Sequence, residues 1–369
     1  MENNNTFATD NVTKTIGYYA VVNTLKAKGV VNKINDIVAT CNSMKYPAKA
    51  YIAEENFSGI FEFFKALLFS KHKIVFVRYT TLLAPLVFFI CLFLRLKGKK
   101  IIIDVPTPRR VALKEVLGAN KSLFYKVVNF FVLIISSSWV FIPANLVIQY
   151  ADESHWFSFG LIKRTLKMGN GIVIRTETPL QSASWPNNEL VLIGAAQLAY
   201  WHGFDRVLRA IHELQNEEMG YQIRFIIAGD GGELQSLKEL VTQLKLQNTV
   251  EFRGVLTGVE LDKAFAESHV GIASLGLYRK NLTEASDLKT REYLSRGFMV
   301  IAAGNDIDFP NENPFRIEVP NDNSIEDLKQ VLSGFKDRKL PEPKLARAYA
   351  KENLSFEGKL RKVFSKINC

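Results

Sequence analysis

The sequence predicts an α/β protein made of two Rossmann-like domains that face each other across a cleft. Its 369 residues exceed what one ordinary hydrophobic core organises. Short apolar runs typical of buried strands alternate with helical stretches, which is the pattern of a doubly wound parallel sheet. The pattern occurs twice, so we expect domains at residues 1–170 and 171–345, followed by a largely helical segment at residues 346–369.

The first half contains five runs that indicate parallel strands. They are Ile16–Val22, Ala48–Ala53, Ile74–Arg78, Lys100–Val105 and Leu146–Tyr150, with a first helix expected at Val30–Thr40. Ligands of open parallel sheets bind beyond the carboxyl ends of the strands. This rule selects Arg78 after the third strand as a cleft or acceptor residue. It also selects Thr107, Arg109 and Arg110 after the fourth, where the two arginines meet a phosphate or form an ordinary solvated turn.

Positive charge is concentrated in the first half. The chain carries a net charge of +10, and residues 1–170 hold 22 Lys and Arg against 10 Asp and Glu, or +12. The remaining residues hold 25 against 27, or −2. This asymmetry favours an anionic partner for the first half, such as a membrane surface, a lipid phosphate or nucleic acid. Nucleic acid is the least favoured, because the chain has no recognition motif for it.

The most apolar window is Leu82–Leu94, which is followed by Arg95, Lys97, Lys99 and Lys100. Its 13 residues are fewer than the roughly 20 that a spanning helix needs. Two interpretations of this window remain, a crossover helix packed in the core and a helix inserted into one leaflet of a membrane. The shorter apolar run Phe130–Ile135 allows the same two interpretations with a weaker signal. With the basic excess, these windows predict peripheral attachment to an anionic membrane face.

The second half repeats the alternation of strands and helices. Its expected strands are Leu190–Gly194, Ile223–Ala228, Val250–Gly254, Val270–Ser274 and Met299–Ala303, preceded by a polar linker at Thr176–Asn188. A glycine-rich turn, Gly229–Gly232, follows the second of these strands. Such a turn between strand and helix lets the backbone approach a ligand closely.

The segment Thr283–Ala302 indicates a loop, a helix and a buried strand. Thr283 or Ser286 caps the helix, and Asp287 favours its first turn. The amino terminus of a helix offers unpaired N–H groups and a partial positive charge, which suit a phosphate. Lys289 and Glu292 are three residues apart and share a helical face. The alternative is an amphipathic helix with a solvated Lys289–Glu292 pair.

This segment resembles the Glu-x7-Glu signature of retaining glycosyltransferases of family 4, which have the GT-B fold. The matching residues are Ser286, Leu288, Lys289, Glu292, Tyr293, Leu294 and Gly297. The resemblance implies that Glu284 lies near the donor sugar and Glu292 near the ribose of the nucleotide. It also implies that the terminal helix crosses back to the first domain.

Three further elements resemble the same family in the expected order. Asn170-Gly171-Ile172 resembles the turn that ends the family's first domain, with Val173 in place of its usual Asp. Gly229-Asp230-Gly231-Gly232 resembles the family's Gly-Asp-Gly-Pro turn. Arg253 ends a strand at which related enzymes hold the base.

The element around Gly203 departs from the family. Gln197 and His202 stand where the family has the Arg and Lys that grip the donor diphosphate. A neutral imidazole supplies little charge above its usual pKa near 6.5. We therefore expect Lys289 and the backbone at Ser286, Asp287 and Leu288 to take over the diphosphate.

The resemblance implies an enzyme that moves a sugar from a UDP- or GDP-sugar to a saccharide or lipid-linked acceptor with retention. Its place would be bacterial surface-polysaccharide biosynthesis, in the cytoplasm or on the inner face of the plasma membrane. We expect Glu284, Lys289 and Glu292 to carry the chemistry. Two alternatives are a non-catalytic partner of the same fold that has lost donor binding, and a polyanion-binding protein.

No cofactor or metal is expected. Cys41, Cys91 and Cys369 are far apart and suggest a reducing compartment without a structural metal site. Asp306-Ile307-Asp308 invites a metal-binding interpretation, but it follows a strand in the half that already holds the proposed donor site. The polar start of the chain, Met1–Thr15, shows no apolar segment typical of a secretory signal.

Overall fold

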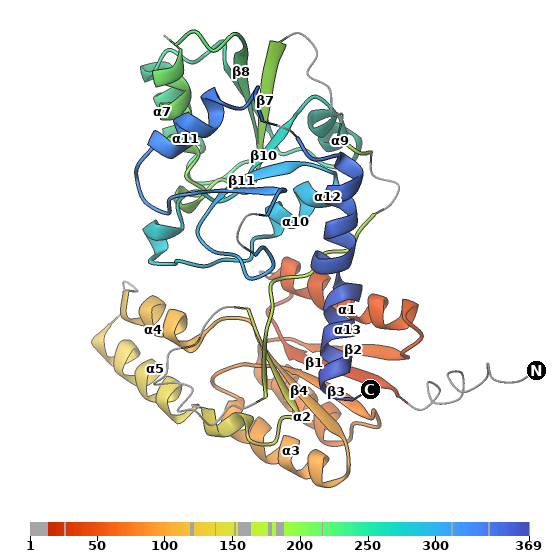
Figure 1. Cartoon of the computed structure of the whole chain (residues 1–369). Helices are drawn as coiled ribbons and strands as arrows, with labels where there is room; N and C mark the ends of the chain where they lie inside the picture. Colours follow the sequence, from red (N-terminus) through yellow and green to blue (C-terminus); the bar gives the residue numbers. More distant parts are fainter. Residues whose placement is uncertain are drawn as a thin grey trace, which may run out of the picture. The chain divides into compact units, whose positions relative to one another are not determined.

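The computed structural model describes residues 14–25, 27–118, 122–136, 138–150, 153, 164–175, 179–181, 188–215, 217–310, 313–338 and 340–368. The chain forms two compact units, each with its own sheet (Figure 1). Unit 1 comprises Met1–Met168 and Phe356–Cys369, and unit 2 comprises Gly169–Ser355.

Unit 1 is built on a six-stranded parallel sheet. Its strands are β1 (Ile16–Val21), β2 (Ala48–Ala53), β3 (Ile74–Arg78), β4 (Lys100–Val105), β5 (Leu146–Gln149) and β6 (Thr165–Lys167). They lie in the order β2-β1-β3-β4-β5-β6. The five expected strands are found within one residue of their predicted bounds. The short β6 was missed because its three residues are too few to show a pattern.

The helices of unit 1 cover both faces of this sheet. They are α1 (Lys28–Ser43), α2 (Phe57–Leu68), α3 (Ala84–Leu96), α4 (Arg109–Gly118), α5 (Leu123–Ile135), the short η2 (Ser138–Phe141) and α13 (Phe356–Lys366). Successive strand residues point to opposite faces, so β3 places Phe76 in the core under α1 and α13. Its neighbour Val77 lies in the core under α2, α3 and η2.

The chain returns to unit 1 at its carboxyl end. Helix α12 (Pro343–Tyr349) and the following turn η6 (Ala350–Leu354) belong to unit 2. Helix α13 instead buries Leu360, Val363 and Phe364 in the core that α1 shares with the first sheet. The change of unit falls at Ser355 and Phe356.

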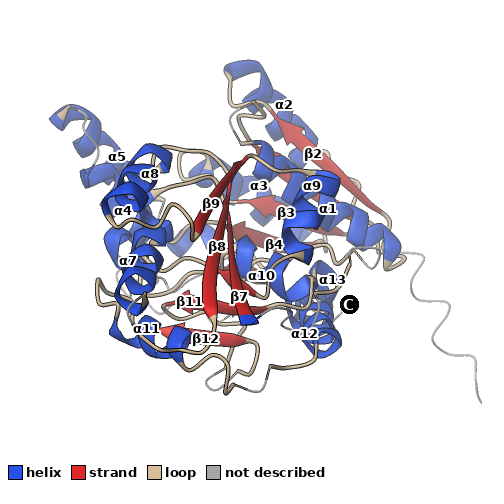
Figure 2. Cartoon of the chain, turned by 90° about the horizontal axis from the view of Figure 1, so that it is seen from above, coloured by secondary structure: helices blue, strands red, loops and turns tan. Residues whose placement is uncertain are grey.

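Unit 2 is a second six-stranded parallel sheet between helices (Figure 2). Its strands are β7 (Glu189–Ala195), β8 (Gln222–Ala228), β9 (Val250–Gly254), β10 (Val270–Ile272), β11 (Met299–Ala303) and β12 (Arg316–Val319), in the order β12-β11-β10-β7-β8-β9. The helices are α7 (Phe204–Leu214), α8 (Leu234–Gln243), α9 (Gly258–Ala266), α10 (Leu288–Ser295) and α11 (Glu326–Ser333), with short turns η4 (Tyr200–His202) and η5 (Leu277–Lys280). Both units are Rossmann-like, as the sequence predicts.

Helix α3 connects β3 to β4 and packs Ala84, Cys91 and Leu94 inward. These contacts confirm the expectation of a crossover helix for its inner side. Among the residues that the structure describes, no helix is long and apolar enough to cross a membrane. Cys41 and Cys91 are both buried and carry free thiols.

Candidate donor site in unit 2

The candidate site lies where the order of the second sheet reverses. Strand β7 leads to β8 on one side, whereas its other neighbour, β10, leads away to β11. In open parallel sheets this switch point, beyond the carboxyl ends of the strands, is where ligands bind. The loops after β7 and β10 are joined there, because Leu275 N donates to His202 O at 2.9 Å and Gly276 N donates to Trp201 O at 3.2 Å.

Gly203 makes this close approach of two loops possible. Its φ of +66° is in the left-handed region, which strains any residue with a side chain. A Cβ at this position would also lie 2.8 Å from the backbone carbon of Leu275. A glycine is therefore required where the loop after β7 turns into α7.

Asp287 fixes the start of α10 beside the end of β10. One carboxylate oxygen caps the helix by accepting from Thr290 N at 2.9 Å. The other accepts from the backbone N–H of Ser274 at 3.1 Å. Asp287 is therefore the cap of α10, and the predicted cap at Thr283 or Ser286 is wrong. Asp287 is favoured because its second carboxylate oxygen also accepts from an N–H group at the sheet edge.

Ser286 serves a different purpose from capping. Its hydroxyl accepts from Asn170 N at 2.5 Å, and Asn170 Nδ2 donates to Ser286 O at 2.7 Å. The Asn-Gly turn therefore holds the loop before α10. Gly169 packs tightly here, since a Cβ on it would lie 1.9 Å from an oxygen of Asp308.

Lys289 is a largely enclosed cation at this helix start. Its Nζ lies 3.2 Å from Ser274 Oγ and 5.7 Å from the centre of the Phe204 ring. Burial lowers the pKa of Lys289 to about 8, although the carboxylate of Asp287 opposes the shift. Burial alone would raise the pKa of Asp287, but Lys289, Thr290 and Arg291 lower it to about 2. An ionised carboxylate thus supports a lysine that is mostly protonated at neutral pH.

His202 contributes no charge to the site. Burial, and then the positive charge of Lys289, lower the pKa of His202 to about 3. Its Nδ1 accepts a hydrogen bond from Ala199 N at 3.3 Å. Gln197, the other residue that replaces a family cation, is exposed. The charge available to an anion at this point therefore comes from Lys289.

The glycine-rich turn after β8 packs against the loop after β7. A Cβ on Gly229 would lie 1.7 Å from Ala196 O, and one on Gly231 would lie 2.2 Å from Leu198 O. Both have φ values in the glycine region, +139° and +154°. Leu198 N also donates to Asp230 O at 2.8 Å. These contacts fix the shape of the site wall.

Arg253, at the end of β9, is already engaged by two carboxylates. Its Nη2 lies 2.7 Å from Glu251 Oε2 and 2.6 Å from Glu267 Oε2. Arg224 pairs with the same two acids. Arg224 also pairs with Glu189, the first residue of β7, so the guanidinium of Arg253 belongs to a cluster of two arginines and three glutamates.

The two glutamates of the signature have different surroundings. Glu284 lies in a loop that bridges to Asn305 just after β11. Glu292 on α10 pairs with Arg296, with 2.7 Å between Oε1 and Nε, and its side chain is 40% exposed. Lys289 contacts Ser274 instead of Glu292, so the alternative of a solvated Lys289–Glu292 pair is wrong.

Arg291 accounts for the Asp-x-Asp pattern. Its guanidinium is fully buried and binds both Asp306 and Asp308, with Nη2 2.7 Å from Asp306 Oδ1 and 2.6 Å from Asp308 Oδ2. These carboxylates neutralise an arginine inside unit 2. In the described part of the chain, no group of three or more acidic, His or Cys side chains is arranged to hold a metal ion.

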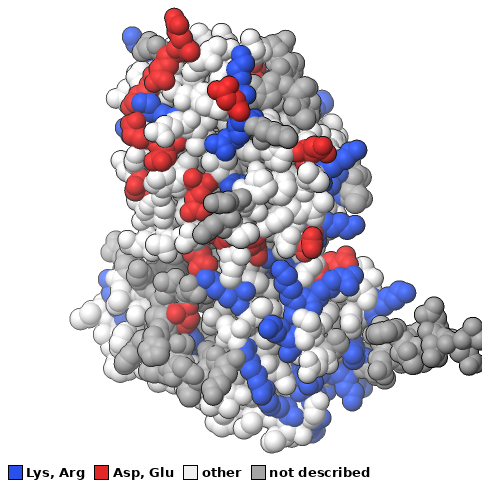
Figure 3. Space-filling view, in the orientation of Figure 1, with Lys and Arg blue, Asp and Glu red and all other residues white. Residues whose placement is uncertain are grey.

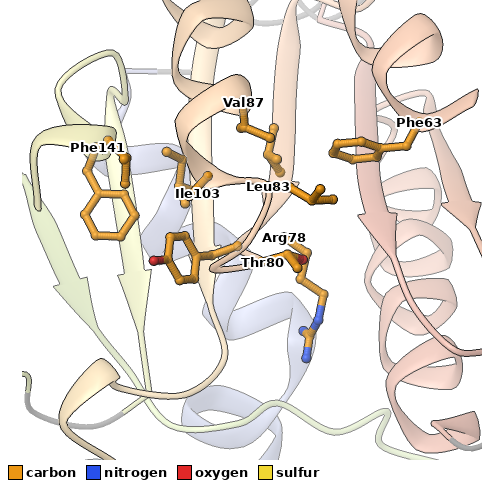
Figure 4. A pocket seen from close by; sticks show the side chains of 11 residues that line it. Phe63, Arg78, Thr80, Leu83, Val87, Ile103 and Phe141 are labelled. Carbon is orange, nitrogen blue, oxygen red and sulfur yellow. The ribbon is translucent and has the colours of Figure 1, made fainter. Parts of the chain in front are cut away.

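In unit 1 the selected residues are spread along the carboxyl edge of the sheet. Arg78 Nη1 lies 3.5 Å from Asp104 Oδ2, and Thr107 is exposed in the loop after β4. Arg109 is 0% exposed, with its Nε 3.2 Å from Glu153 Oε2. The side chain of Arg110 lies outside the described residues. Arg78 lines a mainly apolar pocket, in which it points away from Leu83 and Val87 (Figure 4).

Three residues of the site were not predicted. Ser274 contacts Lys289 and Asp287, Asn170 holds the loop before α10, and Arg291 organises the acids behind it. Ser274 lies two residues after the end of β10, so the carboxyl-edge rule could have selected it. Arg291 gives no signal in sequence, because its partners lie 15 and 17 residues away.

The sequence of unit 2 is similar to glycosyltransferase domains. Residues 176–304 match the family model described as glycosyl transferases group 1. A segment of 119 residues is 28% identical to alpha-monoglucosyldiacylglycerol synthase of Streptococcus pneumoniae. That similarity covers 32% of this chain and only 25% of the length of that protein.

The fold of the whole chain is similar to solved glycosyltransferases. HepE of Anabaena, solved in complex with UDP, has a TM-score of 0.63 at 15% identity, covering 95% of this chain and 99% of that one. The lipopolysaccharide outer core galactosyltransferase WaaB has a TM-score of 0.60 at 12% identity over 95% and 99%. A glycosyltransferase of Rickettsia africae gives 0.57 at 14% over 97% and 98%. Together with the two parallel sheets, these similarities show that the chain has the GT-B fold.

Proposed function

We propose that this protein is a glycosyltransferase that binds a nucleoside diphosphate sugar on unit 2. The observation that carries the proposal is Lys289, a desolvated cation at the start of α10 and at the switch point of the sheet. A helix amino terminus with an adjacent lysine suits a diphosphate. The same segment lies within the match to glycosyl transferases group 1.

The proposed chemistry is electrostatic stabilisation of the leaving diphosphate. As the bond to the sugar breaks, negative charge grows on the diphosphate, and Lys289 with the N–H groups at the start of α10 stabilises that charge. Asp287 helps to keep Lys289 protonated. Glu284 contacts sugar hydroxyls and Glu292 the ribose, as in the family that the sequence resembles. We propose retention of configuration and no requirement for a metal ion.

A uridine nucleotide is the favoured donor. The solved neighbour HepE was crystallised with UDP, with UDP and glucose, and with UDP-glucose. These ligands belong to that protein, and they support testing UDP-sugars before GDP-sugars here. We propose that the nucleotide extends past Gly229 and Gly231 in the turn after β8 and past the backbone at Arg253, whose guanidinium is engaged by Glu251 and Glu267.

The proposed acceptor is a saccharide or a lipid-linked saccharide used in cell-surface polysaccharide or glycolipid synthesis. The names of a structural neighbour, a lipopolysaccharide outer core galactosyltransferase, and of a relative, alpha-monoglucosyldiacylglycerol synthase, support this class. The charge of +12 in residues 1–170 suits an acceptor that carries phosphate. We propose a cytoplasmic protein attached peripherally to the inner face of the plasma membrane.

The test is transfer from a panel of UDP- and GDP-sugars, with product stereochemistry assigned by NMR. We expect turnover with a UDP-sugar, an unchanged anomeric configuration, and a loss of about 30-fold or more in kcat/KM for Lys289→Ala, because a charged hydrogen bond is removed. Inversion, or an unaffected Lys289→Ala variant, would contradict the mechanism.

One observation favours a second candidate, a non-catalytic protein of the same fold. The residues in place of the family's two cations are an exposed Gln197 and a neutral His202, so the diphosphate loses two positive charges. Calorimetry separates the two candidates. If calorimetry detects no binding of any nucleoside diphosphate at millimolar concentration, the second candidate, the non-catalytic protein, is supported.

A further inference from the structure

The outward side of α3 carries a continuous apolar stripe. The stripe begins at Leu82 in the turn before the helix, recurs every three or four residues and is between 41% and 80% exposed: Leu82, Leu86, Phe89, Phe93 and Leu96. This spacing places them along one side of the helix, opposite the buried Ala84, Cys91 and Leu94. A crossover helix whose outer side met only water would carry polar residues there.

Two neighbouring helices extend this apolar surface. On α2, Phe57 and Phe61 are one turn apart and 91% and 67% exposed. On α5, Leu133 is the only buried residue of the 13 in the helix, all of which the structure describes. Its large exposed side chains are Leu123, Phe124, Tyr125, Val127, Val128, Phe130, Phe131 and Ile135.

These helices are held close to α3. Phe63 and Leu67 of α2 share one hydrophobic core with Cys91 and Leu94 of α3. Just after α5, Ser136 Oγ donates to Thr81 O at 2.6 Å, in the turn that begins α3. Helices α2 and α3 are therefore neighbours, and α5 ends beside the start of α3; we call the exposed apolar residues of these three helices the apolar face.

Positive charge accompanies the apolar face. Residues 82–100 contain no Asp or Glu, and Lys97 and Lys100 are exposed there, whereas Arg95 and Lys99 donate to backbone carbonyls of unit 1. Lys97 Nζ lies 4.3 Å from the centre of the Phe93 ring, so its stem lies along the stripe. Figure 3 shows Lys and Arg gathered over unit 1 and most of the visible Asp and Glu over unit 2. In unit 2 the exposed large apolar residues are few and scattered.

We propose that unit 1 docks on an anionic lipid bilayer through the apolar face, with the exposed Phe57, Phe61, Phe89 and Phe93 entering the boundary between headgroups and acyl chains. Apolar side chains beside lysines are the combination that binds such a surface. A second copy fits less well, because it would bring the same lysines together. The proposal rests on the peripheral location proposed above.

Flotation with vesicles tests the docking without any catalytic readout. The wild type and a Phe89→Ser/Phe93→Ser variant are mixed with vesicles of phosphatidylcholine alone or with one third phosphatidylglycerol. Val255→Ser/Val259→Ser, which removes two residues of unit 2 that are 71% and 68% exposed, is the matched control. Phe57→Ser provides an independent variant on α2. Thermal unfolding of each variant reports on folding.

We expect the wild type and the control to float with anionic vesicles and to bind less in high salt. Binding should fall about tenfold or more in the α3 variant, because two apolar contacts with the bilayer are lost. A wild type that does not float, or an α3 variant that floats equally, would overturn the proposal. If the wild type and the control are dimers in solution and the α3 variant is a monomer, the face binds a second copy of the chain instead of a bilayer. UDP binding by the same variants reports separately on the proposed function.

Discussion

The charge state of Lys289 makes nucleotide binding depend on pH. Its pKa is lowered to about 8, so the cation is present below that pH and is lost as the pH rises through it. About nine tenths of the lysine is protonated at pH 7.0 and about one quarter at pH 8.5. If only the protonated form binds the diphosphate, the Kd for UDP rises about fourfold between these two values. The terminal phosphate, with a pKa of about 6, is already ionised across this range.

Isothermal titration calorimetry at pH 7.0, 7.5, 8.0 and 8.5 measures this change. Lys289→Arg keeps a cation with a pKa above 12, so its Kd should stay constant over the same range. Asp287→Asn retains a good helix cap but removes the carboxylate that raises the pKa of Lys289. The variant should therefore bind UDP with a higher Kd at pH 7.0 than the wild type, and the rise of its Kd with pH should begin at a lower pH. A flat profile for the wild type, or the same slope in Lys289→Arg, would refute the role of Lys289.

Three other substitutions test the architecture of the site. Arg291→Met leaves Asp306 and Asp308 buried without their cation, so the free energy of unfolding in urea should fall by about 3–5 kcal/mol; an unchanged midpoint would contradict the network. Gly203→Ala places a Cβ at a φ of +66° and should cost about 1–3 kcal/mol, whereas Gly232→Ala, where a Cβ meets nothing within 4 Å, should have little effect in the same thermal unfolding measurement. Glu292→Gln breaks a half-exposed pair with Arg296, so stability should change by less than about 1 kcal/mol, while the KM for the donor should rise about tenfold; an equal loss of stability would indicate a structural role.

The fold was predictable because its strands are short, apolar and bounded by turn residues. The runs Ile16–Val22, Ile74–Arg78 and Lys100–Val105 each form the expected strand to within one residue. Burial on both faces of a parallel sheet produces such continuous apolar runs. The outer side of α3 was not predictable in the same way. Its window is apolar on all sides, and periodicity alone does not say which side meets the core.

The local backbone of the candidate site was partly predictable from the sequence. The glycine turn after β8 follows from turn rules, and a helix forms within Thr283–Ala302 as predicted, but its cap is Asp287 instead of Thr283 or Ser286. Long-range partners were not predictable. Arg109 is buried against Glu153, which is 44 residues away, and Arg253 is engaged by Glu267, which is 14 residues away. Ion pairs of this kind depend on tertiary packing, which one sequence does not reveal.

A crystal structure of the protein soaked with UDP tests the central claim most directly. We expect the diphosphate between the turn at Gly203 and the start of α10, with a phosphate oxygen within hydrogen-bond distance of Lys289 Nζ. UDP bound away from α10, or no nucleotide at saturating concentration, would contradict the assignment of the donor site.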